Sequence, residues 1–174
     1  PTLMLDTTAH LTAVSIDLSM SPPTVTAQTG VAMEVLHNAL QDAGLGMTNC
    51  PAPGALSLGG VLTVNGHGTS IPAIGETTLP GHTFGTLSNM LRSVTAVVWD
   101  VEQQAYALRT FQRSEPEMAA LCVHLGRAFL VEVTMQVGAN ARVRCESFRN
   151  RAASELFAPP ESQGQSFSSF MDAS

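Results

Sequence analysis

The segment from residue 54 to residue 70, GALSLGGVLTVNGHGTS, places five glycines around a single histidine, His67. Glycine lacks a Cβ, so such positions allow positive φ angles and let another molecule approach the backbone closely. Two hydroxyl side chains, Thr69 and Ser70, follow the histidine. We therefore expect a loop whose backbone holds a large, flat and reactive molecule. The apolar residues between the glycines are expected to face the core: Leu56, Leu58, Val61, Leu62 and Val64.

His67 is the leading candidate for chemistry, because the flanking glycines leave its imidazole uncovered. A neutral imidazole nitrogen is both a nucleophile and a general base near neutral pH. Composition alone leaves a second interpretation open, that of an ordinary polar residue in a loop. The other histidines have no partner at metal-ligand spacing, so no metal site is expected: His10, His37, His82 and His124.

Three common glycine or serine motifs are missing from this segment. Ser57 does not stand in GxSxG, which argues against a serine hydrolase. The glycines fit neither GxGxxG between a strand and a helix nor the GK[ST] of a P-loop, so Rossmann and NTPase functions are disfavoured. Successive backbone N–H groups still leave open a nest that binds phosphate.

The chain has 174 residues, the size of one domain, of which 44% are apolar and only 13% are charged. Soluble domains average roughly 25% charged residues, so we expect a large buried interface or a bound apolar ligand. The net charge is −6 and all eight cations are arginines, which disfavours nucleic-acid binding. A cluster of four near the C-terminal end is interpreted as a solvated or subunit-facing edge: Arg142, Arg144, Arg149 and Arg151.

No apolar run approaches the roughly 18 residues of a membrane-spanning helix. Three cysteines without a CxxC pair leave one thiol unpaired, so free buried cysteines are expected: Cys50, Cys122 and Cys145. The chain opens on Pro1 without a signal peptide, which leaves the compartment undecided between secreted and cytoplasmic. It is expected to be an internal portion of a larger protein.

Alternating apolar residues predict strands, and a period of 3.6 predicts helices. Strands are expected over 11–18, 24–29, 94–99, 105–111, 129–137 and 141–148. Helices are expected over 31–43, 83–93 and 114–125, the last opened by a capping box from Ser114 to Glu117, carrying His124 near its end and closed by Gly126. This order predicts an α+β fold with a mainly antiparallel sheet and flanking helices.

Several segments resemble the vanillyl-alcohol-oxidase family with its PCMH-type FAD-binding domain. The similarity is greatest to the covalent-flavin (type II) cholesterol oxidases. It lies in PAPGALSLGGV and GHGTS of the glycine segment, then in GHTFGTLSN, VTAVVW and LGRAFLVEVTMQ at residues 81–89, 94–99 and 125–136. The resemblance thus covers most of the chain, and the glycine–histidine segment is its most specific part.

The resemblance implies that residues 53–70 wrap FAD and its pyrophosphate, and that His67 forms the covalent bond to the flavin. It also implies cofactor contacts from residues 126–131. The full set of cofactor-binding residues implied is Pro53, Gly54, Gly59, Gly60, Val61, Gly66, His67, Gly68, Thr69, Ser70, Gly126, Phe129 and Val131. The parent protein would then oxidise the CH–OH group of a sterol or another alcohol with O2 as acceptor, giving a ketone and H2O2.

The resemblance also implies what the chain leaves out. Residues 1–158 would form the second, incomplete subdomain of an FAD-binding domain, and 159–174 a linker toward a substrate cap. The catalytic residues are expected outside these positions. An alternative is a catalytically inactive flavin-domain fragment that acts as a folded or homo-oligomeric module, because half a cleft exposes apolar surface.

Overall fold

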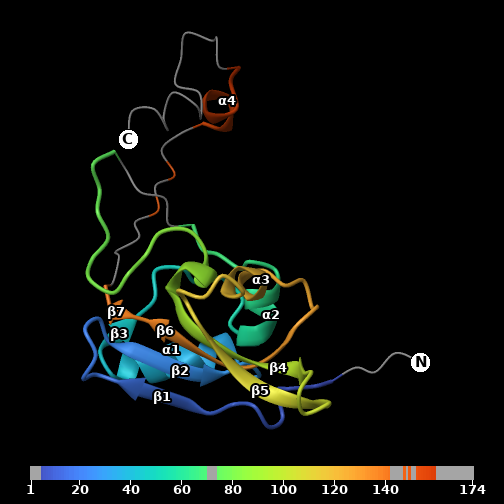
Figure 1. Cartoon of the computed structure of the whole chain (residues 1–174). Coiled ribbons are helices and arrows are strands. Elements are labelled where there is room, and N and C mark those ends of the chain that lie inside the picture. Colours follow the sequence, from blue (N-terminus) through green and yellow to red (C-terminus); the bar gives the residue numbers. More distant parts are fainter. Residues whose placement is uncertain (1–4, 70–73, 142–146, 148, 150–151, 160–174) are drawn as a thin grey trace. The chain divides into compact units, whose positions relative to one another are not determined.

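The computed structural model describes residues 5–69, 74–141, 147, 149 and 152–159 (Figure 1). The chain divides into two compact units, residues 1–141 and 142–174. The larger unit contains, in order, β1 (Val14–Asp17), β2 (Thr24–Gln28), α1 (Met33–Asp42), β3 (Leu45–Gly46), α2 (Leu58–Thr63), the 3-10 helix η1 (Leu87–Met90), β4 (Leu91–Asp100), β5 (Ala105–Gln112), α3 (Met118–Cys122), β6 (Phe129–Gln136) and β7 (Gly138–Ala139). The described part of the smaller unit carries α4 (Ala153–Leu156).

Five strands form one antiparallel sheet in the order β1-β2-β6-β4-β5, and β3 pairs with β7 in a small second sheet. Strand β6 lies at the centre because its alternating apolar residues match both neighbours: Val133 pairs with Ala27 of β2 and Val94 of β4. The opposite face carries hydroxyl pairs instead, such as Thr26 and Thr134 at 2.9 Å. This alternation buries one face of the sheet.

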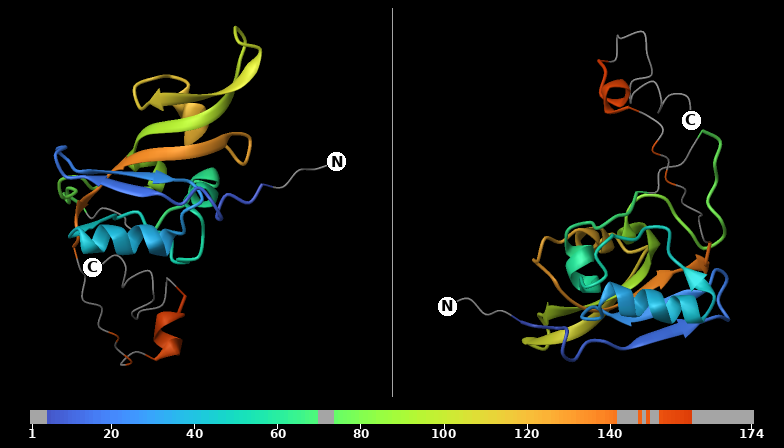
Figure 2. Two further views of the ribbon diagram at one scale, coloured as in Figure 1. Left: turned by 90° about the horizontal axis from the view of Figure 1, so that it is seen from below. Right: turned by 180° about the vertical axis from the view of Figure 1, so that it is seen from behind.

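The helices cover the apolar face, and Figure 2 shows α1 and α2 on one side of the sheet. Helix α1 buries Met33, Leu36 and Leu40, which share one face at a spacing of three and four residues. They join side chains of β2, β4 and β6 in one core cluster. Each fully buried side chain of this size contributes roughly 1.5–3 kcal/mol. The α+β fold with a mainly antiparallel sheet and flanking helices is confirmed.

Two predicted helices differ from the structure. Residues 83–93 form only the short η1 and then enter β4, because Gly81 and Gly85 have positive φ angles of 85° and 97° and turn the chain before Leu87. The helix expected over 114–125 is limited to Met118–Cys122. Gly126 therefore does not close it.

The capping box from Ser114 to Glu117 is also wrong, since Glu117 makes no side-chain bond to the start of α3. The carboxylate of Glu115 is engaged instead, accepting hydrogen bonds from Gln112 N at 2.8 Å and from Arg109 at 2.9 Å.

Two of the expected core contacts of the glycine segment are wrong as well. Leu58, Val61 and Leu62 are buried, but Leu56 and Val64 are 44% and 64% exposed. The apolar core contacts come from helix α2 (Leu58–Thr63), whereas Leu56 precedes its N-cap Ser57 and Val64 is its C-cap. The strand predicted over 141–148 lies outside the described residues except for Ala141 and Ser147, which are not in a strand.

Candidate functional site

The glycine segment begins with a helix that is capped from within the chain. Ser57 Oγ accepts a hydrogen bond from Gly60 N at 3.3 Å. Leu58 N donates to the carbonyl of Val31 at 2.9 Å, and Gly59 N donates to that of Thr29 at 2.7 Å. The first N–H groups of α2 therefore already have acceptors, so the phosphate nest that the sequence left open does not form at these residues.

The glycines are needed mainly for packing against this chain itself. None of the five between residues 54 and 68 has a positive φ. A Cβ at Gly59 would lie 3.0 Å from Thr29 Cβ, and one at Gly68 would lie 2.8 Å from the carbonyl oxygen of Cys50. At Gly66 it would collide with Val61 Cγ1. Gly60 is different, because a Cβ there would meet only Ser57 Oγ, at 3.1 Å.

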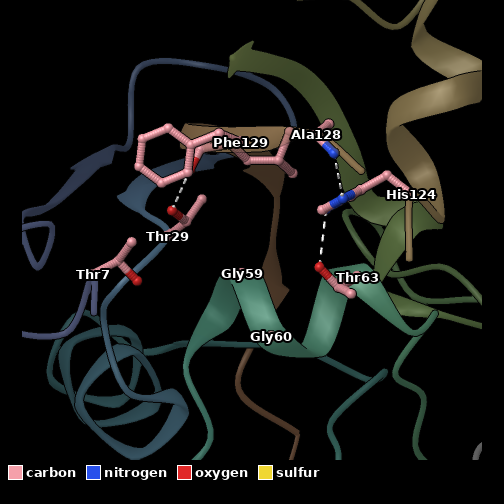
Figure 3. A pocket seen from close by; sticks show the side chains of 9 residues that line it. Thr7, Thr29, Gly59, Gly60, Thr63, His124, Ala128 and Phe129 are labelled. Atoms are coloured by element: carbon pink, nitrogen blue, oxygen red, sulfur yellow. Dashed lines mark hydrogen bonds between the residues drawn. The ribbon is translucent and has the colours of Figure 1, made fainter. Parts of the chain in front are cut away.

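Gly60 and Gly59 line a pocket between α2 and the start of β6 (Figure 3). Its volume is about 120 Å³, smaller than the roughly 300–1,000 Å³ of complete ligand sites. Of the predicted cofactor residues, the pocket collects Gly59, Gly60 and Phe129. Thr63, Ala128 and Leu130 also line it and lie within the segments 53–70 and 126–131, although the sequence did not single them out. Sequence reasoning missed the other lining residues, Thr7, Thr29 and His124.

His124 connects the two walls of this pocket. Its Nε2 lies 3.0 Å from Thr63 Oγ1 at the end of α2, and its Nδ1 accepts from Ala128 N at 3.3 Å just before β6. A backbone hydrogen bond joins the same two segments, from Leu125 N to the carbonyl of Thr63 at 3.0 Å. The sequence placed His124 in the last turn of a helix over 114–125. In the structure it lies after α3 and contacts the end of α2 instead.

The protonation of His124 follows from these partners. An amide N–H only donates, so Nδ1 must accept and the ring proton lies on Nε2, which donates to Thr63 Oγ1. Burial lowers the pKa of His124 below its usual 6.5. The imidazole is therefore neutral at pH 7 and protonated on Nε2, so it accepts from Ala128 on one wall and donates to Thr63 on the other.

His67 does not line the pocket, although the sequence makes it the leading candidate. It forms an isolated antiparallel bridge with Thr86, and its side chain is exposed. Nδ1 lies 2.8 Å from the carbonyl oxygen of Gly68, which can only accept. In the neutral ring the proton is on Nδ1, and Nε2 carries the nucleophilic lone pair.

The remaining predicted residues are spread around this region. Pro53 and Thr69 are exposed, Gly54 packs against Glu34, and Ser70 lies outside the described residues. Val131 contributes its carbonyl, which accepts from Thr29 N at 3.0 Å. Gly126, at φ +77°, belongs to the turn between α3 and β6 with open space where a Cβ would stand.

Two further histidines have internal partners. His37 Nε2 lies 2.9 Å from Cys50 Sγ; burial lowers the pKa of the imidazole and raises that of the thiol, which keeps both groups neutral. His82 Nε2 donates to the carbonyl of Ala139 at 2.9 Å, and its Nδ1 lies 2.8 Å from Thr48 Oγ1. Within residues that the structure describes, no three His, Cys, Asp or Glu side chains could hold a metal ion.

Among the helices of the described residues, none is long and apolar enough to cross a membrane. Cys50 and Cys122 are free thiols and only half-buried, whereas Cys145 lies outside the described residues. Of the arginine cluster, Arg149 alone is described.

Comparison with known proteins gives no matching family model and no matching curated protein, but many similar solved structures. A solvent-stable cholesterol oxidase is 52% identical over 97% of this chain, with a TM-score of 0.87. Cholesterol oxidase from Brevibacterium sterolicum is 47% identical over 95% of the chain, with a TM-score of 0.85. The chain spans only 31% and 30% of these two proteins.

The fold also extends to more distant oxidases. A glucooligosaccharide oxidase from Acremonium strictum matches 77% of this chain at 20% identity, with a TM-score of 0.58, and this chain covers 25% of it.

Proposed function

Because the chain belongs to the vanillyl-alcohol-oxidase family with its PCMH-type FAD-binding domain, we propose that it is part of an FAD-dependent sterol oxidase. The observation that carries the proposal is the 52% identity to a cholesterol oxidase over 97% of the chain. Since the chain spans 31% of that protein, the activity and the sterol substrate of the whole protein are part of this proposal.

The pocket beside α2 fits one part of FAD. Gly59 and Gly60 present a surface without side chains, Phe129 and Leu130 add apolar contacts, and Thr63 adds a hydroxyl. A volume of about 120 Å³ holds a fraction of a dinucleotide, so further contacts must come from other parts of the protein. When bound, FAD would supply the redox chemistry of the overall reaction, alcohol + O2 → ketone + H2O2, in which the alcohol loses a hydride and a proton and O2 gains both.

The finer part of the proposal is that His67 holds the flavin covalently. Its support is the resemblance of GHGTS together with the exposure of the imidazole and the lone pair on Nε2. Because His67 does not line the pocket, a flavin attached there must extend beyond the pocket along residues 66–69.

The absorption spectrum and intact mass of the purified, denatured chain test this proposal. A flavin spectrum with the mass of FAD added to the chain is expected, and His67→Ala should remove the added mass. Val35→Ala, at an exposed site on α1, is the matched control and should keep it. Flavin that is released on denaturation, or that stays attached to the His67→Ala chain, would overturn covalent attachment at His67. Either result would still agree with a domain that binds FAD.

A second candidate is a flavin module without turnover of its own. The observation in its favour is an apolar patch on one face of the β4–β5 hairpin, where Trp99, Tyr106 and Leu108 are 50%, 75% and 63% exposed. Such a patch is typical of a subunit or domain interface. Cholesterol turnover followed by peroxide detection separates the two, because an oxidase forms peroxide and an inactive module forms none; light scattering then shows whether the module is a homo-oligomer.

A further inference from the structure

The turn from His124 to Ala128 joins the two walls of the pocket by hydrogen bonds. His124 bonds Thr63 on the α2 wall and Ala128 on the β6 wall, and it is only 8% exposed. Thr63 and His124 are 61 residues apart in the chain, so this contact is a tertiary connection. Figure 3 shows both bonds crossing the gap between the helix and the strand.

The two bonds also fix the direction of the hydroxyl. Ala128 N–H donates to Nδ1, so Nε2–H donates to Thr63 Oγ1, and the hydroxyl hydrogen of Thr63 is left to donate elsewhere. Thr29 on the same surface is different, because its hydroxyl hydrogen is used on the carbonyl of Leu130 at 2.6 Å. Thr63 therefore offers the pocket a donor that is oriented by His124.

The rest of the pocket disfavours an anion. The side chains that line it include no cation, and His124, the only titratable one among them, is neutral at pH 7. The N–H groups of Leu58, Gly59 and Gly60 already donate within the chain. A flat glycine surface, apolar walls and a hydroxyl donor suit a planar, uncharged ring with an acceptor at its edge.

We propose that His124 is a positioning residue that orients the Thr63 hydroxyl toward the acceptor edge of a planar nitrogen heterocycle lying on Gly59 and Gly60. This inference rests on the proposed flavin function, because the adenine and isoalloxazine rings of FAD are such heterocycles. It assigns the pocket to one of these rings and not to the pyrophosphate.

The tautomer is tested first, on the full chain with His67→Ala, which carries no covalently attached flavin and is also used for the titrations. Imidazole ¹⁵N chemical shifts at pH 7 should show a neutral His124 protonated on Nε2. A ring protonated on Nδ1, or on both nitrogens, would overturn the inference whatever the protein binds.

The ligand is tested by titrating adenosine, riboflavin and sodium pyrophosphate separately into the ¹⁵N-labelled chain. We expect one of the two heterocycles to shift the amide signals of Gly59 and Gly60, which identifies the ring, and pyrophosphate to leave them unchanged. Shifts from pyrophosphate, or from neither heterocycle, would overturn the assignment.

Matched variants of Thr63 test the hydroxyl itself. Thr63→Val removes the hydroxyl at nearly constant shape and should weaken binding of that heterocycle about fivefold, as expected for one neutral hydrogen bond. Thr63→Ser keeps the hydroxyl and should bind as the wild type does. Equal binding by both variants would contradict a donor at Thr63.

The pH dependence adds a readout that a merely structural role would not give. When His124 is protonated, its Nδ1–H and the N–H of Ala128 are two donors that face each other, and their hydrogen bond is lost. Binding of the heterocycle should therefore weaken as pH falls through the pKa of His124. Thr63→Val should lose this pH dependence, because it lacks the hydroxyl that His124 orients. If binding to the wild type and to Thr63→Val has the same pH profile, His124 does not act through the Thr63 hydroxyl and the proposal is contradicted. If the heterocycle binds as expected but the purified protein oxidises no alcohol, the proposed function fails while this inference stands.

Discussion

At the scale of single residues, the glycines around His67 differ in what they do. A Cβ at Gly68 would lie 2.8 Å from a backbone oxygen and 3.1 Å from a backbone nitrogen of Cys50, neither of which can move aside easily. Gly60 has one neighbour within reach, the rotatable hydroxyl of Ser57. A conformational reason for glycine, which the sequence suggested, applies to none of the five.

Gly68→Ala should therefore destabilise the protein, by about 1–3 kcal/mol, as overpacking does elsewhere. Urea denaturation measures the change in the free energy of unfolding. Gly60→Ala is the control: better helix propensity of about 1 kcal/mol offsets its contact with Ser57, so its stability should stay near that of the wild type. Equal losses in both variants would show that the close approach to Cys50 is not the reason for Gly68.

His124, which is buried, and His37, which is half-buried, predict a stability that falls in mild acid. Burial lowers the pKa of both His37 and His124 below 6.5. In mild acid the unfolded chain therefore binds more protons at these two side chains than the folded chain does. The free energy of unfolding should decrease as pH falls from about 7.5 to about 5. Thermal unfolding across this range measures it.

The double variant His37→Gln with His124→Gln should be less stable at pH 7.5 but show a flatter profile over the same range. His67→Ala is the matched control, because this side chain is exposed; its profile should keep the slope of the wild type. A double variant as steep as the wild type would place the acid sensitivity elsewhere.

At the scale of elements, helix α2 depends on its N-cap. Ser57→Ala should cost about 1 kcal/mol in the free energy of unfolding, because Gly60 N loses its acceptor. Ser114→Ala is a matched control: the sequence predicts a cap there as well, but α3 starts later without a side-chain cap. Denaturant titrations of the two variants should differ, and equal effects would contradict the assignment of the cap.

The strands were predictable and the short helices were not. Strongly apolar segments over 94–99 and 129–137 indicate β4 and β6, and alternation over 105–111 indicates β5, because a strand beside a buried face carries apolar side chains on that face. The segment that leads into β4 carries Phe84, Leu87 and Met90 at helical spacing with Leu91, the first residue of the strand, yet the positive φ angles of Gly81 and Gly85 turn the chain there. Intrinsic periodicity is a weak guide where turns decide the path.

The site was predictable only in its local part. Gly59, Gly60 and Phe129 follow from the resemblance, and the structure places all three around one pocket. The hydrogen bond between Thr63 and His124 joins positions 61 residues apart, so no local sequence pattern predicts it. His67, the most conspicuous residue of the sequence, lies outside that pocket.

At the scale of the whole molecule, our proposal makes the pocket one part of a larger binding surface for FAD. It is about 120 Å³, and the chain spans 31% of the cholesterol oxidase that it resembles at 52% identity. On this proposal the chain supplies a glycine surface, an oriented hydroxyl and apolar walls, and the affinity for FAD should depend on how closely a ring can approach Gly60.

The affinity for FAD with and without Gly60→Ala tests this account most directly. With every variant made on His67→Ala, so that no flavin is covalently attached, fluorescence titration with FAD should show equal binding with and without Val35→Ala, and a Kd raised about tenfold by Gly60→Ala, because the added methyl group stands on a residue that lines the pocket. Equal affinity with and without Gly60→Ala, or no binding of FAD to the His67→Ala chain, would contradict the account.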